Sequence, residues 1–229
     1  MIEYDKDAVV YPYITEYLRA LAPESSGILK ELEEEAERDG VPIIQKESAR
    51  LLSVLCELKR PAHVLEIGCA IGYSALLMAE KLAPDGRILS LEIDGEMARR
   101  ARENIARAGK SDTITVRECD AVETVPTLTG KYDLIFLDGP KAHYIHMLGD
   151  CIRLLSDGGL LISDNILYKG MTADPEHVVR RKITIVKRLR HFVKAQMMRG
   201  ELETVVLPLG DGMTVAVKKT GNRHLKGIL

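Results

Sequence analysis

The amino-acid sequence predicts an α/β protein with a doubly wound, mostly parallel sheet of seven strands. From residue 61 onward, short apolar runs alternate with amphipathic stretches, a rhythm typical of strand–helix–strand units. The last two apolar runs are separated only by a short glycine-containing turn, so we expect the last strand to be antiparallel. The first 60 residues show only helical spacing, which predicts an N-terminal helical extension to this Rossmann-like core.

Three helices are expected in the N-terminal extension, over residues 14–21, 27–38 and 47–59. Gly40 marks the end of the second, because a glycine readily takes the left-handed conformation that closes a helix. We interpret the whole chain, residues 1–229, as a single domain. It divides into the N-terminal helices (1–60), the Rossmann-like core (61–219) and a tail (220–229).

The core is expected to contain seven strands and five helices. The strands are predicted at residues 63–69, 87–93, 113–118, 132–137, 159–163, 202–207 and 213–218. The helices are predicted at residues 73–82, 96–108, 121–128, 144–155 and 178–198. Parallel strands carry their ligand sites beyond their carboxyl ends, so the residues that follow each strand are the candidates for function.

Bulk composition excludes several classes of function. The formal net charge is -2, and only 4% of residues are aromatic, which argues against a stacking platform for single-stranded nucleic acid. No run of about 18 apolar residues is present, so no membrane span is expected. The N-terminus lacks the pattern of a signal peptide, and the four cysteines form no C-x-x-C pair, so we expect a cytoplasmic protein with free thiols.

A small-ligand site is predicted after the first strand. Gly68 and Gly72 allow a tight turn and a close approach of backbone to ligand, but they do not form the G-x-G-x-x-G pattern. Glu66 at the strand end disfavours a diphosphate and suits a cationic ligand such as a sulfonium. Glu92, which ends the second strand, can accept hydrogen bonds from ribose hydroxyls. Asp120 and Ala121 follow the third strand, where an adenine would lie.

Polar residues also follow the fourth and fifth strands. Asp138, Asp164 and Asn165 would meet at adjacent strand ends and present two carboxylates and an amide oxygen. Such hard oxygen ligands suit Mg²⁺ better than Zn²⁺. Simpler interpretations stay open: Asp138 could cap the helix that begins near Tyr144, and Asp164 with Asn165 could signal a turn. The glycines after the first strand could likewise only shape a turn, with the acids as solvated strand ends.

Residues 66–74 resemble the first motif of class I methyltransferases that use S-adenosylmethionine (SAM). The Gly-Tyr-Ser ending is similar to that of the catechol and caffeoyl-coenzyme A O-methyltransferase family. The resemblance implies SAM as cofactor and a homodimer. The cofactor-binding residues it implies are Ile44, Glu66, Gly68, Gly72, Ser74, Glu92, Asp120, Ala121 and Asp138.

The same resemblance covers the strand ends that carry the polar residues. Asp138, Asp164 and Asn165 match the metal ligands of the family, and Lys141 matches its catalytic lysine. The family reaction implied is O-methylation, with Mg²⁺ or another divalent cation activating the acceptor hydroxyl. Asp138 and Lys141 are then the catalytic residues. His143 and His146 are interpreted as structural.

The acceptor is expected to be transfer RNA. Residues 41–46, 164–170 and 208–212 resemble the bacterial branch that methylates 5-hydroxyuridine in transfer RNA, and residues 177–200 carry eight basic side chains and no acid. The basic stretch could instead be a solvated helix that pairs with the acidic residues 31–39. A small catechol or caffeoyl-type phenol is the alternative acceptor. A SAM-binding module without catalysis is a more distant alternative.

Overall fold

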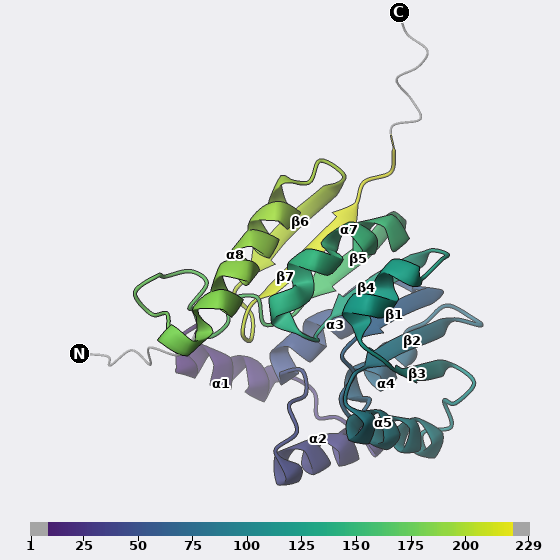
Figure 1. Cartoon of the computed structure of the whole chain (residues 1–229). Coiled ribbons are helices and arrows are strands. Elements are labelled where there is room, and N and C mark those ends of the chain that lie inside the picture. Colours follow the sequence, from purple (N-terminus) through teal and green to yellow (C-terminus); the bar gives the residue numbers. More distant parts are fainter. Residues whose placement is uncertain (1–8, 222–229) are drawn as a thin grey trace, which may run out of the picture.

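The computed structural model describes residues 9–221 and contains a seven-stranded sheet (Figure 1). Its strands are β1 (His63–Ile67), β2 (Arg87–Glu92), β3 (Ile114–Glu118), β4 (Tyr132–Leu137), β5 (Leu155–Ser163), β6 (Leu202–Leu207) and β7 (Met213–Lys218). The strand order is β3-β2-β1-β4-β5-β7-β6, and every pairing is parallel except the two made by β7, which runs antiparallel to both β5 and β6. The predicted doubly wound fold is therefore confirmed, with the order reversing beside β1.

Eight α-helices and three short 3₁₀ turns accompany these strands within the described residues. The helices are α1 (Pro12–Leu21), α2 (Gly27–Asp39), α3 (Lys46–Lys59), α4 (Tyr73–Ala79), α5 (Gly95–Arg107), α6 (Ala121–Thr124), α7 (Tyr144–Leu154) and α8 (Ile183–Met198). The 3₁₀ turns are η1 (Val125–Thr127), η2 (Lys141–His143) and η3 (Arg180–Lys182). Three predicted helices are shorter than expected by more than one residue. The one expected at 73–82 ends at Ala79. The one expected at 121–128 changes to 3₁₀ geometry around Pro126, whose ring removes a backbone donor. The one expected from residue 178 begins as an α-helix only at Ile183.

Helices cover both faces of the sheet (Figure 1). Side chains alternate along each central strand, so that Val64 and Phe136 join one apolar cluster while Leu65 and Ile135 join the other. The first cluster includes side chains of α2 to α5, and the second includes those of α6, α7 and α8. Burial on both faces explains why these strands read as continuous apolar runs. It leaves the carboxyl ends of the strands as the open edge of the core.

The N-terminal helices attach to this core in different ways. Leu29 and Leu32 of α2 are buried in the first apolar cluster. Helix α1, every residue of which the structure describes, buries none of them. An ion pair at 2.8 Å joins Arg19 of α1 to the buried Glu47 of α3. The proposed division of the chain into helices, core and tail stays a prediction, and the expectations for residues 1–8 and most of the tail lie outside the described part.

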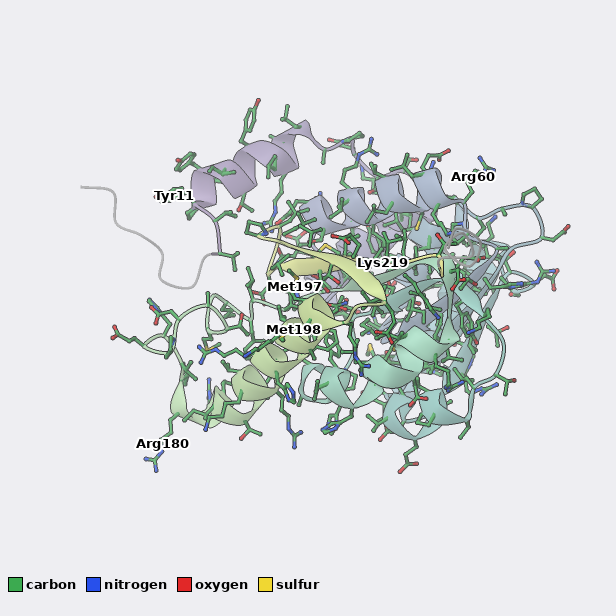
Figure 2. The ribbon with its side chains drawn as sticks, turned by 90° about the horizontal axis from the view of Figure 1, so that it is seen from above. Tyr11, Arg60, Arg180, Met197, Met198 and Lys219 are labelled. Atoms are coloured by element: carbon green, nitrogen blue, oxygen red, sulfur yellow. The ribbon has the colours of Figure 1, made fainter. Side chains whose placement is uncertain are left out.

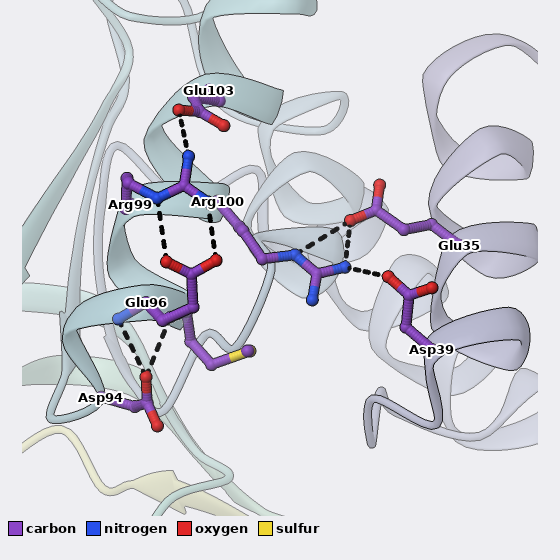
Figure 3. A network of polar contacts seen from close by, with 8 residues as sticks. Glu35, Asp39, Asp94, Glu96, Arg99, Arg100 and Glu103 are labelled. Carbon is purple, nitrogen blue, oxygen red and sulfur yellow. Dashed lines mark hydrogen bonds and ion pairs between the residues drawn. The ribbon is translucent and has the colours of Figure 1, made fainter.

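The acidic face of α2 pairs with arginines of α5 (Figure 3). Arg100 contacts both Glu35 and Asp39, at 2.7 Å in the case of Asp39, and Arg107 contacts Glu31. Since α2 and α8 contribute to opposite faces of the sheet, the suggested pairing of residues 31–39 with the basic helix is wrong. The acidic stretch instead fixes α2 beside α5.

Two exclusions drawn from composition can be compared with the structure. Across residues 9–221, no helix has the length and apolar character that crossing a membrane requires. All four cysteines are free thiols; Cys56, Cys69 and Cys151 are buried, and Cys119 is half-buried.

Candidate active site

A cavity of about 490 Å³ opens at the carboxyl ends of the strands. Its wall comes from the ends of β1 to β5 and from the link before α3. The lining residues are 42–45, 67–70, 73, 74, 91–93, 97, 119–121, 138–141, 164 and 165. The volume lies in the range of small-molecule sites. This cavity lies at the strand ends where the sequence predicted a ligand site.

The two glycines after β1 have different surroundings. Gly68 lines the cavity at φ 86°, and a Cβ there would lie 2.6 Å from the carbonyl oxygen of Asp138. Only glycine therefore permits the close approach of the β1 and β4 ends. Gly72, at φ 90°, precedes α4 and lies outside the cavity lining. A Cβ on Gly72 would meet Ala101 of α5 at 3.4 Å, so this glycine shapes the turn and the packing of two helices.

Glu92 fixes the backbone around the cavity. One carboxylate oxygen accepts hydrogen bonds from the backbone N–H groups of Cys69 and Ala70, at 3.1 and 2.9 Å. The other accepts from Ile93 and Asp94, at 2.9 and 3.0 Å. Glu92 also lines the cavity. It is not the solvated strand end that the simpler interpretation required.

Glu66 lies behind the cavity lining, although the sequence suggested direct contact with a ligand. It is fully buried, and its carboxylate accepts hydrogen bonds from Ser74 at 2.6 Å and Ser90 at 2.5 Å. Burial raises the pKa of Glu66 to about 7, against the effect of both hydroxyls. Ser74 does line the cavity. Glu66 therefore reaches the cavity through Ser74.

Ile44, Asp120 and Ala121 all line the cavity, as the sequence predicted. The Asp120 carboxylate also accepts a hydrogen bond of 2.8 Å from the Val122 N–H and caps α6. The apolar side chain of Met97 on α5 joins this wall. Sequence reasoning missed Met97, because a methionine on an amphipathic helix is more often a core residue.

The other end of the cavity brings together the four predicted polar residues. Lys141 donates a hydrogen bond of 2.9 Å from Nζ to the Asp138 carboxylate. Asp164 is buried and accepts from the Asn165 N–H at 2.8 Å, while Asn165 has a positive φ of 54°. The alternative role of Asp138 as a helix cap is excluded, since no side chain caps α7. The chain bends at Asn165, and both Asp164 and Asn165 line the cavity.

The charges at this end favour a bound cation. Burial raises the pKa of both Asp138 and Asp164, and the nearby Asp138 contributes to the rise of Asp164 to about 7. Lys141 opposes both shifts. Two carboxylates and an amide oxygen are hard ligands, and a divalent cation would offset their repulsion. The residues therefore fit Mg²⁺. Neither His143 nor His146 lines the cavity; their rings contact each other, with centroids 5.8 Å apart.

Tyr144 supports these strand ends from beneath, and sequence reasoning missed it. It is fully buried, and its hydroxyl donates to the Leu137 carbonyl oxygen at 3.0 Å. Its ring packs edge-on against Phe192 of α8, with centroids 5.3 Å apart. An aromatic residue at the start of a helix gives no sequence signal for this role. The contact fixes the residue directly before Asp138.

Comparison with known proteins identifies the family. A family model described as O-methyltransferase matches residues 20–219. The chain belongs to the O-methyltransferase family. A catechol O-methyltransferase of Niastella koreensis is 30% identical over 188 residues, which cover 79% of this chain and 85% of the relative. Caffeoyl-CoA O-methyltransferase 5 of Nicotiana tabacum is 31% identical over 223 residues, covering 92% and 91%.

Solved structures of O-methyltransferases agree. The crystal structure of a putative O-methyltransferase from Klebsiella pneumoniae has a TM-score of 0.79 and 30% sequence identity, covering 91% of this chain and 97% of that one. This chain is a SAM-dependent O-methyltransferase, as the motif after the first strand implied. The alternative of a binding module without catalysis is set aside. The comparisons lend no support to the predicted transfer RNA branch of the family.

Proposed function

We propose that this O-methyltransferase methylates one hydroxyl of a small phenol that carries two neighbouring oxygens, in a reaction that needs a divalent cation. The observation that carries the proposal is the meeting of Asp138, Asp164 and Asn165 with Lys141 at one end of the cavity. Two vicinal oxygens can bind one cation together, and the catechol and caffeoyl-CoA enzymes among the relatives support this class of acceptor.

SAM would occupy the cavity along the strand ends. Glu92 would accept hydrogen bonds from the ribose, and Asp120 with Ala121 would border the adenine. Ser74, held by the buried carboxylate of Glu66, would face the amino-acid part of the ligand. The positive charge of the sulfonium suits a wall that carries several acids. The proposed placement uses the cofactor-binding residues predicted from sequence, except that Gly72 would act only through the turn and Glu66 only through Ser74.

Asp138, Asp164 and Asn165 would hold the divalent cation. When bound, a divalent cation supplies a Lewis acid that lowers the pKa of the acceptor hydroxyl. Lys141 would take the proton from that hydroxyl at Nζ, or hold the oxyanion that remains. The acceptor oxygen would then displace the sulfur in line at the methyl carbon, forming one C–O bond as the C–S bond breaks. Positioning of the two reactants supplies much of the acceleration.

The basic helix offers less support to a transfer RNA acceptor than its sequence suggested. Arg190 donates to the carbonyl oxygens of Met171 and Thr172, both at 2.8 Å, so it holds backbone rather than presenting a free charge. Arg188 likewise reaches the Ala142 carbonyl, at 3.4 Å. Arg180 does project away from the molecule (Figure 2). A 5-hydroxyuracil also offers a hydroxyl beside a carbonyl oxygen, so transfer RNA is kept as the alternative acceptor in the experiment below. The predicted homodimer remains a proposal.

The test is a parallel methylation assay with SAM and Mg²⁺, read by mass spectrometry. The acceptors are a catechol, caffeoyl-CoA and transfer RNA that contains 5-hydroxyuridine. We expect a gain of one methyl on a phenolic acceptor, lost in excess chelator and in Asp164→Ala. Methylation of the nucleoside without turnover of either phenol would overturn the proposal. Full activity in chelator would overturn its metal dependence.

A further inference from the structure

The loop that follows β5 has an unusual backbone. Asn165, Tyr168 and Lys169 have φ values of 54°, 48° and 55°. They are three of the six non-glycine residues with positive φ in the described part of the chain. The left-handed conformation is costly for a residue with a Cβ, and it persists only where neighbouring structure imposes it. Because Asn165 is in this loop, the shape of the loop determines how its amide meets the cavity.

The turn between β6 and β7 imposes that shape. The Ile166 N–H donates to the Gly212 carbonyl at 2.9 Å, and the Leu167 N–H donates to the Asp211 carbonyl at 3.0 Å. The Lys169 N–H donates to the carboxylate of Asp211. The side chain of Asp211 therefore fastens the residue that stands at positive φ, four positions beyond Asn165.

The turn itself has little freedom to move. A Cβ on Gly210 would lie 2.4 Å from Ser48 Oγ, and one on Gly212 would lie 2.3 Å from Leu167 Cγ. The backbone of the turn is thus seated directly against α3 on one side and against the loop on the other. A rigid turn can transmit its position to the loop through the bonds of Asp211.

Asp211 also lies beside the open side of the active site. It lines a hollow of about 330 Å³ together with Lys169, Gly210 and Gln45. Gln45 lines the active-site cavity as well, so the hollow adjoins the cavity at this residue. The loop and the turn thus form part of the approach to the acceptor position.

We propose that Asp211 is a positioning residue for methyl transfer. It acts through the Lys169 N–H, holding residues 165–169 so that Asn165 and the acceptor side of the cavity keep their geometry. The proposal rests on the proposed function, because it assigns Asn165 to the cation and the acceptor. It requires a hydrogen-bond acceptor at position 211, and it does not require a negative charge there.

The decisive comparison is Asp211→Ala with Asp211→Asn. Loss of a charge-assisted hydrogen bond should raise the KM for the phenol, and the Mg²⁺ concentration for half-activation, by about tenfold in Asp211→Ala. SAM affinity by calorimetry should stay within about twofold, since the cofactor contacts lie on other strand ends. The amide oxygen of Asp211→Asn can still accept from the Lys169 N–H, so this variant should keep both values near those of the wild type.

Hydrogen exchange provides a second readout that does not depend on the acceptor. In Asp211→Ala, the amides of Leu167 and Lys169 should exchange faster, while those of β5 and β7 keep their protection. Unchanged exchange in the loop would overturn the proposal even if no phenol is turned over. So would an Asp211→Asn variant as impaired as Asp211→Ala, because charge rather than the hydrogen bond would then matter. Faster loop exchange in Asp211→Ala, together with a wild-type enzyme that methylates no phenol, would instead refute only the proposed function.

Discussion

The carboxylate of Glu92 lies 2.9 Å from the backbone nitrogen of Ala70, a residue that holds a positive φ of 44°. The bond links the end of β2 to the turn that follows β1. Since a carboxylate offers about four lone-pair directions, the four backbone donors around Glu92 already use its acceptor capacity. A ribose would therefore share these oxygens with the turn, and Glu92 both orders the turn and faces the ligand.

Replacement of Glu92 by Ala should weaken SAM binding by about 1–3 kcal/mol, the range for hydrogen bonds to a charged group. The SAM affinity of Glu92→Gln should lie between those of the wild type and Glu92→Ala, because the amide nitrogen of the glutamine would face backbone N–H donors. Isothermal calorimetry with SAM and with its demethylated product measures both. An affinity for Glu92→Ala equal to that of the wild type would refute the assignment of Glu92 to the ribose.

The strand ends could be predicted because their chemistry is local in sequence. Glu92, Asp138 and Asp164 each follow a clear apolar run, and parallel strands bring such positions to one edge. The sequence places Glu66 at the correct edge, but its buried carboxylate is bound by Ser74 of α4 and Ser90 of β2, which come from other elements. Whether a side chain points into the cavity or lies behind its lining depends on tertiary packing, which the spacing of residues along one strand does not encode.

Long-range supports were the part that sequence could not give. Tyr144 binds a backbone carbonyl 7 residues away at the end of β4, and Asp211 binds a backbone N–H 42 residues away in the loop after β5. A buried tyrosine on a helix and an aspartate between two glycines have common structural explanations, so neither residue type signals this role. For the basic helix the sequence indicated a functional role too readily, because Arg190 binds backbone carbonyl groups of its own chain instead of facing a phosphate.

Asp164 should make the metal-free protein less stable as the pH rises. Burial and Asp138 raise its pKa to about 7 from the ordinary 3.8, so the folded protein keeps a proton that the unfolded chain releases. This contribution to stability is fully present below the unfolded pKa of 3.8 and is lost as the pH rises through the folded pKa of about 7. In chelator, the Tm of Asp164→Asn should fall less than that of the wild type between roughly pH 4 and pH 7.

Two controls accompany this pH series. The exposed Asp174, whose pKa lies below its ordinary value because of the Glu176 N–H and His177, should leave the slope unchanged when replaced by Asn. Glu66 has a pKa raised in the same direction, so part of the slope should persist in Asp164→Asn and become smaller with Glu66→Gln added. Identical pH slopes for Asp164→Asn and the wild type would contradict the assignment.

Lys141→Ala should reduce kcat by about 10²-fold if the lysine acts as a general base. SAM affinity should change far less, because the contact of Lys141 is with Asp138 at the acceptor end. Steady-state kinetics with the phenol and calorimetry with SAM separate the two effects. Lys187→Ala on the exposed side of α8 is the matched control and should behave as the wild type. A normal rate in Lys141→Ala would make the lysine a bystander.

Charge reversal before α8 separates the two acceptors. Arg180 and Arg181 are exposed and lie in η3, so Arg180→Glu with Arg181→Glu removes basic charge without breaking the bonds of Arg190. Since a neutral phenol is nearly insensitive to ionic strength, catechol methylation should stay within about twofold at low and high salt. Arg60→Glu, far from Arg180 in Figure 2, is the matched control for a changed surface charge. If transfer RNA is the acceptor, the double variant should lose RNA methylation and the Arg60→Glu control should keep it. RNA binding by the double variant should also depend less steeply on salt, because fewer phosphate contacts mean that fewer counterions are released on binding. That pattern, together with a wild-type enzyme inactive on catechol, would replace the phenol by RNA.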